Sequence, residues 1–112
     1  MSCLFCGIVA GDIPATVVRQ TERTLAFRDL NPGAPTHVLV VPRDHYADAA
    51  ELAAADPAYM GEVVAAAAAV AEQEDLTGGY RLVANTGDDA GQTVHHLHIH
   101  VLGGRSMSWP PG

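Results

Sequence analysis

The residues best suited to chemistry are histidines gathered near the C-terminal end of the chain. Four of the six histidines lie in the segment His95-His96-Leu97-His98-Ile99-His100. Because side chains of a β-strand alternate between the two faces of its sheet, this pattern predicts a strand over residues 95–102. One face would carry His96, His98 and His100, and the intervening apolar side chains would be buried on the other. A run of surface histidines without any function is the alternative interpretation.

Three imidazoles on one strand face could bind a metal ion or attack an electrophile. At about 3.3 Å per residue, the Cα atoms of His96 and His100 would lie about 13 Å apart. Since zinc–nitrogen bonds are about 2 Å long, one ion could bind an adjacent pair but not all three. A neutral imidazole is nucleophilic near neutral pH because its pKa is about 6.5. We therefore interpret His98 as a nucleophile toward phosphorus, with the neighbouring imidazoles stabilising charge on the phosphoryl oxygens.

The loop before the histidines offers further groups that could bind a phosphate. Gly91, Gln92 and Thr93 would supply backbone N–H groups and a hydroxyl at the end of the same strand, in the manner of an anion nest. The chain has a net charge of −7, which disfavours nucleic acids and anionic membranes as partners. A single phosphate needs only such local donors, so the negative charge does not exclude a nucleotide.

Composition excludes several other classes of protein. A chain of 112 residues with 48% apolar residues predicts a single globular domain over residues 1–112. Because the chain contains no lysine, Schiff-base catalysis and a Walker-type phosphate site are excluded. The three serines lie outside any G-x-S-x-G motif. The apolar runs are too short to span a membrane, and no basic segment precedes the first of them. With two cysteines only, we expect a cytoplasmic protein.

The elements that must position the histidines follow from periodicity and breaker residues. Asp56-Pro57 is a typical helix start, and Gly78-Gly79 follows the helix end expected near Asp75. A shorter helical turn is expected over residues 48–54. The expected strands cover residues 17–19, 25–27, 37–42, 80–86 and 95–102. This order predicts an α+β fold, with an antiparallel sheet of about five strands, one long helix and one short helix.

Motifs along nearly the whole chain resemble one known family. The segment from His96 to Leu102 alternates histidine with apolar residues and ends on two apolar residues. Together with CLFCGIVAGDIPA, LAFRDLNPGAPTHVLVVPRDH, AGQTVHHLHIHVLGG and the terminal WPPG, it resembles the histidine triad (HIT) superfamily. The LGGR sequence followed by WPPG resembles the Hint branch of nucleotide-binding phosphoramidases.

This resemblance implies a HIT fold, a homodimer whose two sheets join into one, and a nucleotide cleft on each protomer. It implies hydrolysis of purine nucleoside 5′-phosphoramidates, in which AMP is joined to an amine through a P–N bond. His98 matches the nucleophile, which would carry a nucleotidyl group that water then removes. The implied catalytic residues are His37, Thr93, His96, His98 and His100, and the implied nucleotide-binding residues are Asp29, Leu30, Asn85, Gly91, Gln92, Thr93, His98, Ile99, His100 and Trp109.

The resemblance also implies separate tasks for these residues. His100 and the Thr93 hydroxyl would hold the phosphate and assist the leaving amine, and His37 would support the triad from behind. Asp29 would accept hydrogen bonds from the ribose, and Asn85 would contact the phosphate or the leaving group. The C-terminal tail with Trp109 would reach the partner protomer's cleft. Without the resemblance, Asp29 and Asn85 could equally be turn residues, and His37 could simply begin a strand.

Cys3 and Cys6 form a C-x₂-C motif, which alone fits zinc binding, redox chemistry or plain burial. In many bacterial members of the family this motif pairs with a histidine after the P-x-x-H strand and with the first triad histidine. The resemblance therefore implies a structural zinc held by Cys3, Cys6, His45 and His96. Reduced thiols without metal are the alternative. If zinc binds His96, only His98 and His100 remain to act on phosphate.

Three further functions stay open at this point. A dinucleoside polyphosphate hydrolase or nucleotidyl transferase of the same superfamily would differ in the group that leaves phosphorus. A nucleotide-binding regulatory protein would hydrolyse its ligand only incidentally. Metal-dependent hydrolysis is the last option, and full activity after chelation would exclude it.

Overall fold

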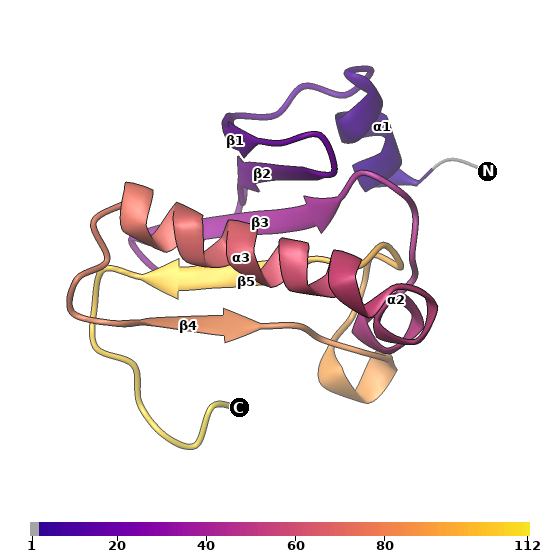
Figure 1. Cartoon of the computed structure of the whole chain (residues 1–112). Coiled ribbons are helices and arrows are strands. Elements are labelled where there is room, and N and C mark those ends of the chain that lie inside the picture. The colour runs from indigo at the N-terminus through magenta and orange to yellow at the C-terminus, as the bar shows by residue number, and fades with distance from the viewer. Residues whose placement is uncertain (1–2) are drawn as a thin grey trace.

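A five-stranded antiparallel sheet forms the centre of the fold (Figure 1). The computed structural model describes residues 3–112. The strands lie in the order β1-β2-β3-β5-β4, and their bounds are β1 Val17–Gln20, β2 Thr24–Arg28, β3 Thr36–Pro42, β4 Tyr80–Val83 and β5 Ile99–Gly103. The predicted α+β class and the antiparallel sheet are confirmed.

The two predicted helices are present and begin at aspartate caps. In α2 (Ala49–Ala55) the Asp48 carboxylate accepts the Glu51 N–H, and in α3 (Pro57–Gln73) the Asp56 carboxylate accepts the Tyr59 N–H. Such caps satisfy N–H groups that the first helical turn leaves free. A short 3₁₀ helix, η1 (Asp88–Ala90), lies in the loop before the histidines. No helix within residues 3–112 is long and apolar enough to cross a membrane.

The sequence prediction missed the N-terminal helix α1 (Leu4–Ala10). Its cap is the Cys3 side chain, whose sulfur lies 3.4 Å from the Cys6 N–H. The usual cap residues are Ser, Thr, Asp and Asn, so a cysteine gave no helix signal. The helix ends at Gly11, which adopts a left-handed backbone conformation with φ of 83° that favours glycine.

The last two strands are shorter than predicted. β5 begins at Ile99 instead of residue 95, because its last partner on β3 is Val40 and β3 itself ends at Pro42. The Leu97 N–H instead donates to the Tyr46 carbonyl at 2.7 Å. β4 ends at Val83, opposite His100, and the residues that would pair with 85 and 86 lie before the start of β5. His95, His96 and His98 therefore precede the strand.

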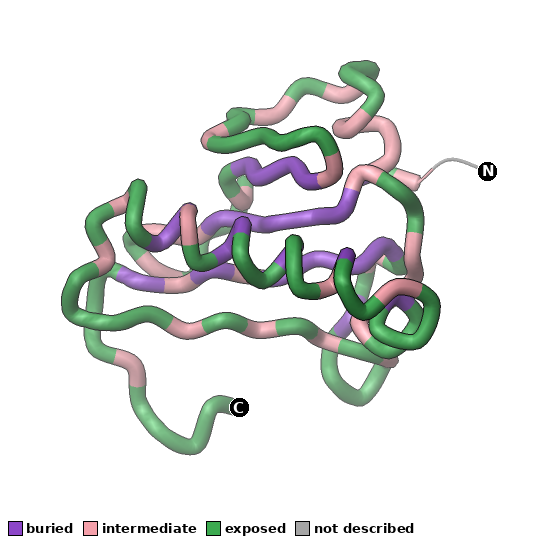
Figure 2. The backbone as a smooth tube through the Cα atoms, viewed as in Figure 1, coloured by how far each residue is buried: buried purple, intermediate pink, exposed green. Residues whose placement is uncertain are grey.

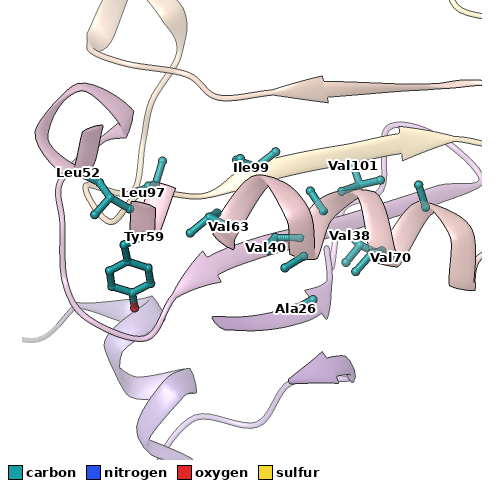
Figure 3. Close-up of a cluster of buried hydrophobic side chains, with 13 residues drawn as sticks. Ala26, Val38, Val40, Leu52, Tyr59, Val63, Val70, Leu97, Ile99 and Val101 are labelled. Atoms are coloured by element: carbon teal, nitrogen blue, oxygen red, sulfur yellow. The ribbon is translucent and has the colours of Figure 1, made fainter. Parts of the chain in front are cut away.

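Two apolar clusters lie on opposite faces of the sheet. The larger one packs α3 against the sheet through Val38, Val40, Leu97, Ile99 and Val101 (Figure 3). The smaller one packs Phe5 of α1 against side chains of β2 and β3 on the other face. Figure 2 shows that β2 and β3 are buried along most of their length while β4 is largely exposed. The predicted burial of Leu97, Ile99 and Val101 on one face is confirmed, which directs His98 and His100 to the face that α1 partly covers.

Candidate active site and metal site

Strand register brings three separated residues together on the face that carries α1. In the register of β3 and β5, Leu39 pairs with His100 and His37 pairs with Leu102. His37 and His100 are therefore diagonal neighbours on one face, within reach of long side chains. Asp29 follows β2, and its N–H donates to the His37 carbonyl at 3.0 Å. Oxygen and nitrogen atoms of Asp29, His37 and His100 form a cluster.

A chain of hydrogen bonds fixes the protonation of His37 and His100. The backbone N–H of Gly33 donates to His37 Nδ1 at 2.9 Å, so in the neutral ring the proton is on Nε2. His37 Nε2 lies 2.9 Å from His100 Nδ1 and 3.4 Å from a carboxylate oxygen of Asp29. His37 therefore donates to His100, whose own proton is on Nε2. His100 is left with an N–H group for an acceptor in the site.

His98 is held in the opposite tautomer. Its Nδ1 lies 2.8 Å from the backbone carbonyl oxygen of His96, and a carbonyl can only accept. Nδ1 therefore carries the proton, and Nε2 of the neutral ring keeps its lone pair. The residue is 8% exposed and packs edge-to-face against Phe5 and His100. An imidazole held in this way can act as a nucleophile.

Burial and neighbouring imidazoles lower the pKa of His100 to about 4, with desolvation as the largest cause. His98 and His37 lower it further by charge repulsion, while the Asp29 carboxylate opposes the shift. His100 is therefore neutral near pH 7 and can donate its Nε2 proton in a hydrogen bond. Strongly perturbed groups of this kind concentrate at functional sites.

The histidines open onto a cavity of about 320 Å³ beside α1. Its polar lining comes from Arg28, Asp29, Asn31, Thr93, His98 and His100. The remaining wall is mostly apolar and comes from α1, the loop after it, β2 and β3, including Leu4, Phe5, Ile8, Ile13, Pro14, Phe27, Leu30 and Leu39. A mostly apolar cavity with a few convergent polar groups is typical of a small-molecule site.

Sequence reasoning missed most of that apolar wall. Among the expected nucleotide-binding residues, Leu30 is the only apolar one that lines the cavity, and it is 91% exposed. Phe5 and Ile8 lie on the helix that was not predicted. Phe27 and Leu39 have ordinary core spacing on strands, so their periodicity could not distinguish a cavity wall from a core.

The other expected nucleotide-binding residues do not line this cavity, as far as residues 3–112 show. The Gln92 side chain is buried and holds the loop, since it accepts the Gly87 N–H and donates to the Ala47 carbonyl. Gly91 adopts a left-handed conformation at the end of η1. The Ile99 side chain lies in the core under α3. Asn85 is half-buried after β4, and Trp109 is 81% exposed in the tail.

A second cluster joins the N-terminal helix to the first histidine. Candidate ligand atoms of Cys3, Cys6, His45 and His96 all lie within 4.8 Å of one another. His96 Nδ1 lies 3.4 Å from the Cys3 sulfur and 3.5 Å from the Cys6 sulfur. The Cys6 sulfur lies 3.3 Å from His45 Nδ1. The two cysteines are free thiols, and they come within bonding range of one ion together with both histidines.

The donor set fits zinc. Tetrahedral zinc with bonds of about 2.3 Å to sulfur and about 2.0 Å to nitrogen places neighbouring donor atoms about 3.5 Å apart. The sulfur–nitrogen distances of 3.3 to 3.5 Å match that spacing. His96 Nε2 lies 2.9 Å from the Pro42 carbonyl, so Nδ1 is free of its proton and faces the sulfurs. The buried His96 ring, whose pKa is lowered by desolvation, is thus presented as a neutral ligand.

The remaining histidine, His95, lies outside both clusters. It is exposed and lines the open hollow beside the two cysteines, whereas Leu97 is buried under α3. Strict alternation along the strand expected over residues 95–102 would place His95 beside Leu97 on the core face, and the structure shows that this does not hold. The reason is that the chain leaves the sheet before Ile99, so strict strand alternation does not extend back to residue 95.

Comparison with known proteins identifies relatives that match almost the whole chain. The family model described as the HIT domain matches residues 10–107. The chain is 45% identical over 111 residues to a protein of Zea mays named 14 kDa zinc-binding protein, covering 97% of this chain and 87% of that protein. It is 40% identical over 111 residues to a protein of Arabidopsis thaliana named adenylylsulfatase HINT1, covering 97% and 76% of the two chains.

Solved structures show the same fold. A HIT family hydrolase from Legionella pneumophila superposes with a TM-score of 0.95 at 46% identity, covering 99% of this chain and 100% of that one. A histidine triad nucleotide-binding protein from Candida albicans superposes with a TM-score of 0.84 at 29% identity, covering 97% and 83%. The sheet, the helices and their order are thus shared with these proteins.

Proposed function

Since this chain belongs to the HIT family, we propose that it is a nucleotide-binding hydrolase that cleaves purine nucleoside 5′-phosphoramidates through a nucleotidyl group on His98. One observation carries the proposal. The His98 Nδ1 proton is held by the His96 carbonyl at 2.8 Å, which leaves the Nε2 lone pair on a residue that lines the cavity. The names of the relatives support a hydrolase that acts on nucleotides.

In the first step, the lone pair of His98 Nε2 attacks phosphorus and the P–N bond breaks. The electron pair of that bond goes to the amine nitrogen, which also takes up a proton from solvent. The products are the free amine and a nucleotidyl group bonded to Nε2. The proton stays on Nδ1, which donates to the His96 carbonyl, so the positive charge of the substituted ring is stabilised by that hydrogen bond.

In the second step, water attacks phosphorus and the bond to Nε2 breaks. The electron pair of that bond returns to the ring, AMP is released, and the proton lost by water goes to solvent. One proton is taken up and one is released over the two steps, so the overall reaction consumes only water and substrate. Splitting the displacement in two replaces one difficult step with two easier ones.

His100 and Thr93 would bind the phosphate during both steps. His100 is neutral, because its pKa is about 4, and a neutral imidazole is too weak an acid to protonate the amine. We assign its Nε2–H to a phosphoryl oxygen, where it stabilises developing charge. Thr93 is exposed and lines the cavity, where its hydroxyl would contact the phosphate and the leaving amine.

The apolar part of the cavity would hold the purine base. Phe5 and Phe27 present aromatic surface there, and Asp29, which lines the same cavity near His37 and His100, would accept hydrogen bonds from ribose hydroxyls. The Asn31 N–H donates to the Asp29 carboxylate at 2.8 Å, which fixes its orientation. We also assign Asn85, Gly91, Gln92, Ile99 and Trp109 a supporting role around the nucleotide, through the loop, the backbone and the tail.

We further propose a structural zinc at Cys3, Cys6, His45 and His96. When bound, zinc would supply charge neutralisation for the thiolates and a cross-link between α1, the chain after β3 and the histidine segment. The name of the maize relative supports this assignment. Metal-binding cysteines must stay reduced, which is consistent with a cytoplasmic location.

A homodimer would complete the assembly. β4 is an edge strand of the sheet formed by the described residues, and it exposes Tyr80 and Leu82. An apolar edge strand is a ready surface for pairing with a second chain. The exposed Trp109 lies on the tail after β5, which could then approach the partner's cleft.

The deciding experiment maps the covalent intermediate. The protein is mixed with an AMP–amine conjugate, quenched in base and digested, and peptides that carry a nucleotidyl group are sequenced by mass spectrometry. We expect the adduct on His98. An adduct on another residue would overturn the assigned roles. Turnover rates with the AMP–amine conjugate, adenylyl sulfate and a diadenosine polyphosphate then rank the leaving groups, and faster turnover of the polyphosphate would favour a dinucleoside polyphosphate hydrolase.

A further inference from the structure

Phe5 connects the metal cluster with the nucleophile. It lies on α1 between Cys3 and Cys6, and its side chain is 5% exposed. Its ring packs edge-to-face against His98, with 5.0 Å between ring centroids, and against His96, with 6.0 Å. It also contacts Phe27 at 5.4 Å. One aromatic ring therefore touches a cluster residue, the nucleophile and the cavity wall.

The helix that carries Phe5 has little support of its own. It has seven residues, and isolated helices of that length are not stable in water. It has no acidic residue in its first turn and no basic residue in its last, so its dipole is not offset by side chains of its own. Its cap is the Cys3 sulfur at 3.4 Å from the Cys6 N–H, and that sulfur belongs to the metal cluster. The cluster and the packing of Phe5, Ile8 and Val9 on the smaller apolar cluster must therefore hold the helix in place.

We propose that the four-residue metal cluster positions Phe5, so that metal occupancy controls both the nucleotide cavity and the ring of His98. This inference rests on the nucleotide and zinc sites proposed above and adds a coupling between them. Phe5 is a positioning residue, because it acts through His98 and the cavity wall. With metal bound, Cys3 and Cys6 fix both ends of the first helical turn and keep Phe5 against His98.

Loss of the metal would act on binding as well as on chemistry. Without the cross-link, α1 can separate from His45 and His96, and Leu4, Phe5 and Ile8 leave the cavity wall together. An aromatic contact with a ligand is worth roughly a tenfold change in affinity. At the same time, the side chain of His96 would no longer be anchored by the metal. The backbone carbonyl of the same residue, which accepts from His98 Nδ1 at 2.8 Å, would then be less firmly placed.

The test measures AMP binding and backbone hydrogen exchange of the zinc-loaded and the chelator-treated full chain. Calorimetry should show a dissociation constant for AMP that is roughly tenfold higher without metal. Amides of α1 should exchange faster, while amides of β3 keep their protection. An unchanged dissociation constant with unchanged exchange in α1 would overturn the inference. So would loss of protection in β3, because the metal would then support the whole fold.

Two variants isolate the coupling. Phe5→Leu should keep its zinc but bind AMP more weakly than the parent protein. Removing zinc from this variant should raise the dissociation constant for AMP by a much smaller factor than in the parent, since the effects of contacting sites are not additive. Additive effects would overturn the inference. Ala10→Ser, at an exposed position on the same helix, is the matched control and should behave as the parent does. Chelator should have no effect on the double variant Cys3→Ser, Cys6→Ser.

Failure of the proposed function gives a different result. If the zinc-loaded protein does not bind AMP at all, the nucleotide site is wrong. The exchange of α1 amides and the ring NMR signals of His98 then still report the positioning. A His98 signal that shifts on metal removal in the parent protein, but much less in Phe5→Leu, supports the coupling. A signal that does not respond overturns it.

Discussion

The backbone carbonyl of His96 accepts the Nδ1 proton of His98 at 2.8 Å, while the His96 ring points its own Nδ1 at two sulfurs. One residue thus contributes its side chain to the four-residue Cys/His cluster and its main chain to the orientation of the His98 ring. The three histidines of the pattern therefore have three different surroundings, because His98 faces the cavity and His100 contacts His37.

Replacing His98 by alanine should abolish turnover of an AMP–amine conjugate. Without the nucleophile no nucleotidyl group can form, and we expect the rate constant to fall by a factor on the order of 10³ or more. Steady-state kinetics measures this loss, and calorimetry with AMP should show binding close to that of the parent. Near-normal turnover in this variant would contradict covalent catalysis by His98.

Replacing His37 by phenylalanine should lower kcat more than it changes KM. The substitution keeps a ring but removes the N–H that His100 Nδ1 accepts at 2.9 Å, so the tautomer of His100 is no longer fixed. Leaving one buried partner unsatisfied corresponds to a roughly ten- to hundredfold loss in rate. His37→Gln restores a donor and should recover part of the rate. Equal rates for the two variants would contradict this positioning role.

The low pKa of His100 predicts a loss of stability in mild acid. The unfolded ring binds a proton below its usual pKa of 6.5, whereas the folded ring does so only below about 4. The unfolded state therefore binds more protons in this window, and stability falls as the pH drops from 6.5 toward 4. Between pH 7 and pH 5 the contribution is about 2 kcal/mol.

Urea denaturation of the parent and of His100→Asn at both pH values isolates this effect. His37, His98 and Asp29 face His100 and are present in both proteins, so the comparison isolates the removal of the His100 ring. The variant should lose less free energy of unfolding on acidification than the parent does. Equal losses in the two proteins would show that His100 titrates normally in the folded state.

Zinc should be present at about one ion per chain in freshly purified protein, as metal analysis by mass spectrometry can measure. Cys6→Ser removes a ligand with two neighbouring histidine nitrogens within 3.5 Å, so zinc should be lost and the Tm should fall by several degrees. His95→Ala changes an exposed histidine near the same cluster and should keep its zinc. Absence of zinc from the parent would remove the proposed metal site.

Leu82→Glu should convert the proposed dimer to a monomer. The charge would lie on the exposed side of the edge strand β4, where a second sheet would have to pair. Val17→Glu is the matched control, because Val17 is similarly exposed on β1 at the opposite edge. Light scattering measures the mass of each variant. A parent protein that is monomeric at micromolar concentration would refute the dimer.

The helix caps and the burial pattern could be predicted from the sequence because they are local. Asp56-Pro57 begins α3 since a carboxylate cap and a proline are compatible with a first turn. Leu97, Ile99 and Val101 alternate with histidines, so their burial under α3 follows from strand periodicity. α1 escaped prediction since its cap is a cysteine sulfur.

The sequence by itself determined the class of fold, the main helix and the pairing of apolar with imidazole side chains. Only the tertiary structure decided the tautomers of His96 and His100, because both depend on partners that are distant in the chain. Gly33 and His37 fix His100, and Pro42 with the two cysteines fixes His96. Strand register and loop path bring these partners together, and neither is encoded in the spacing of the histidines themselves.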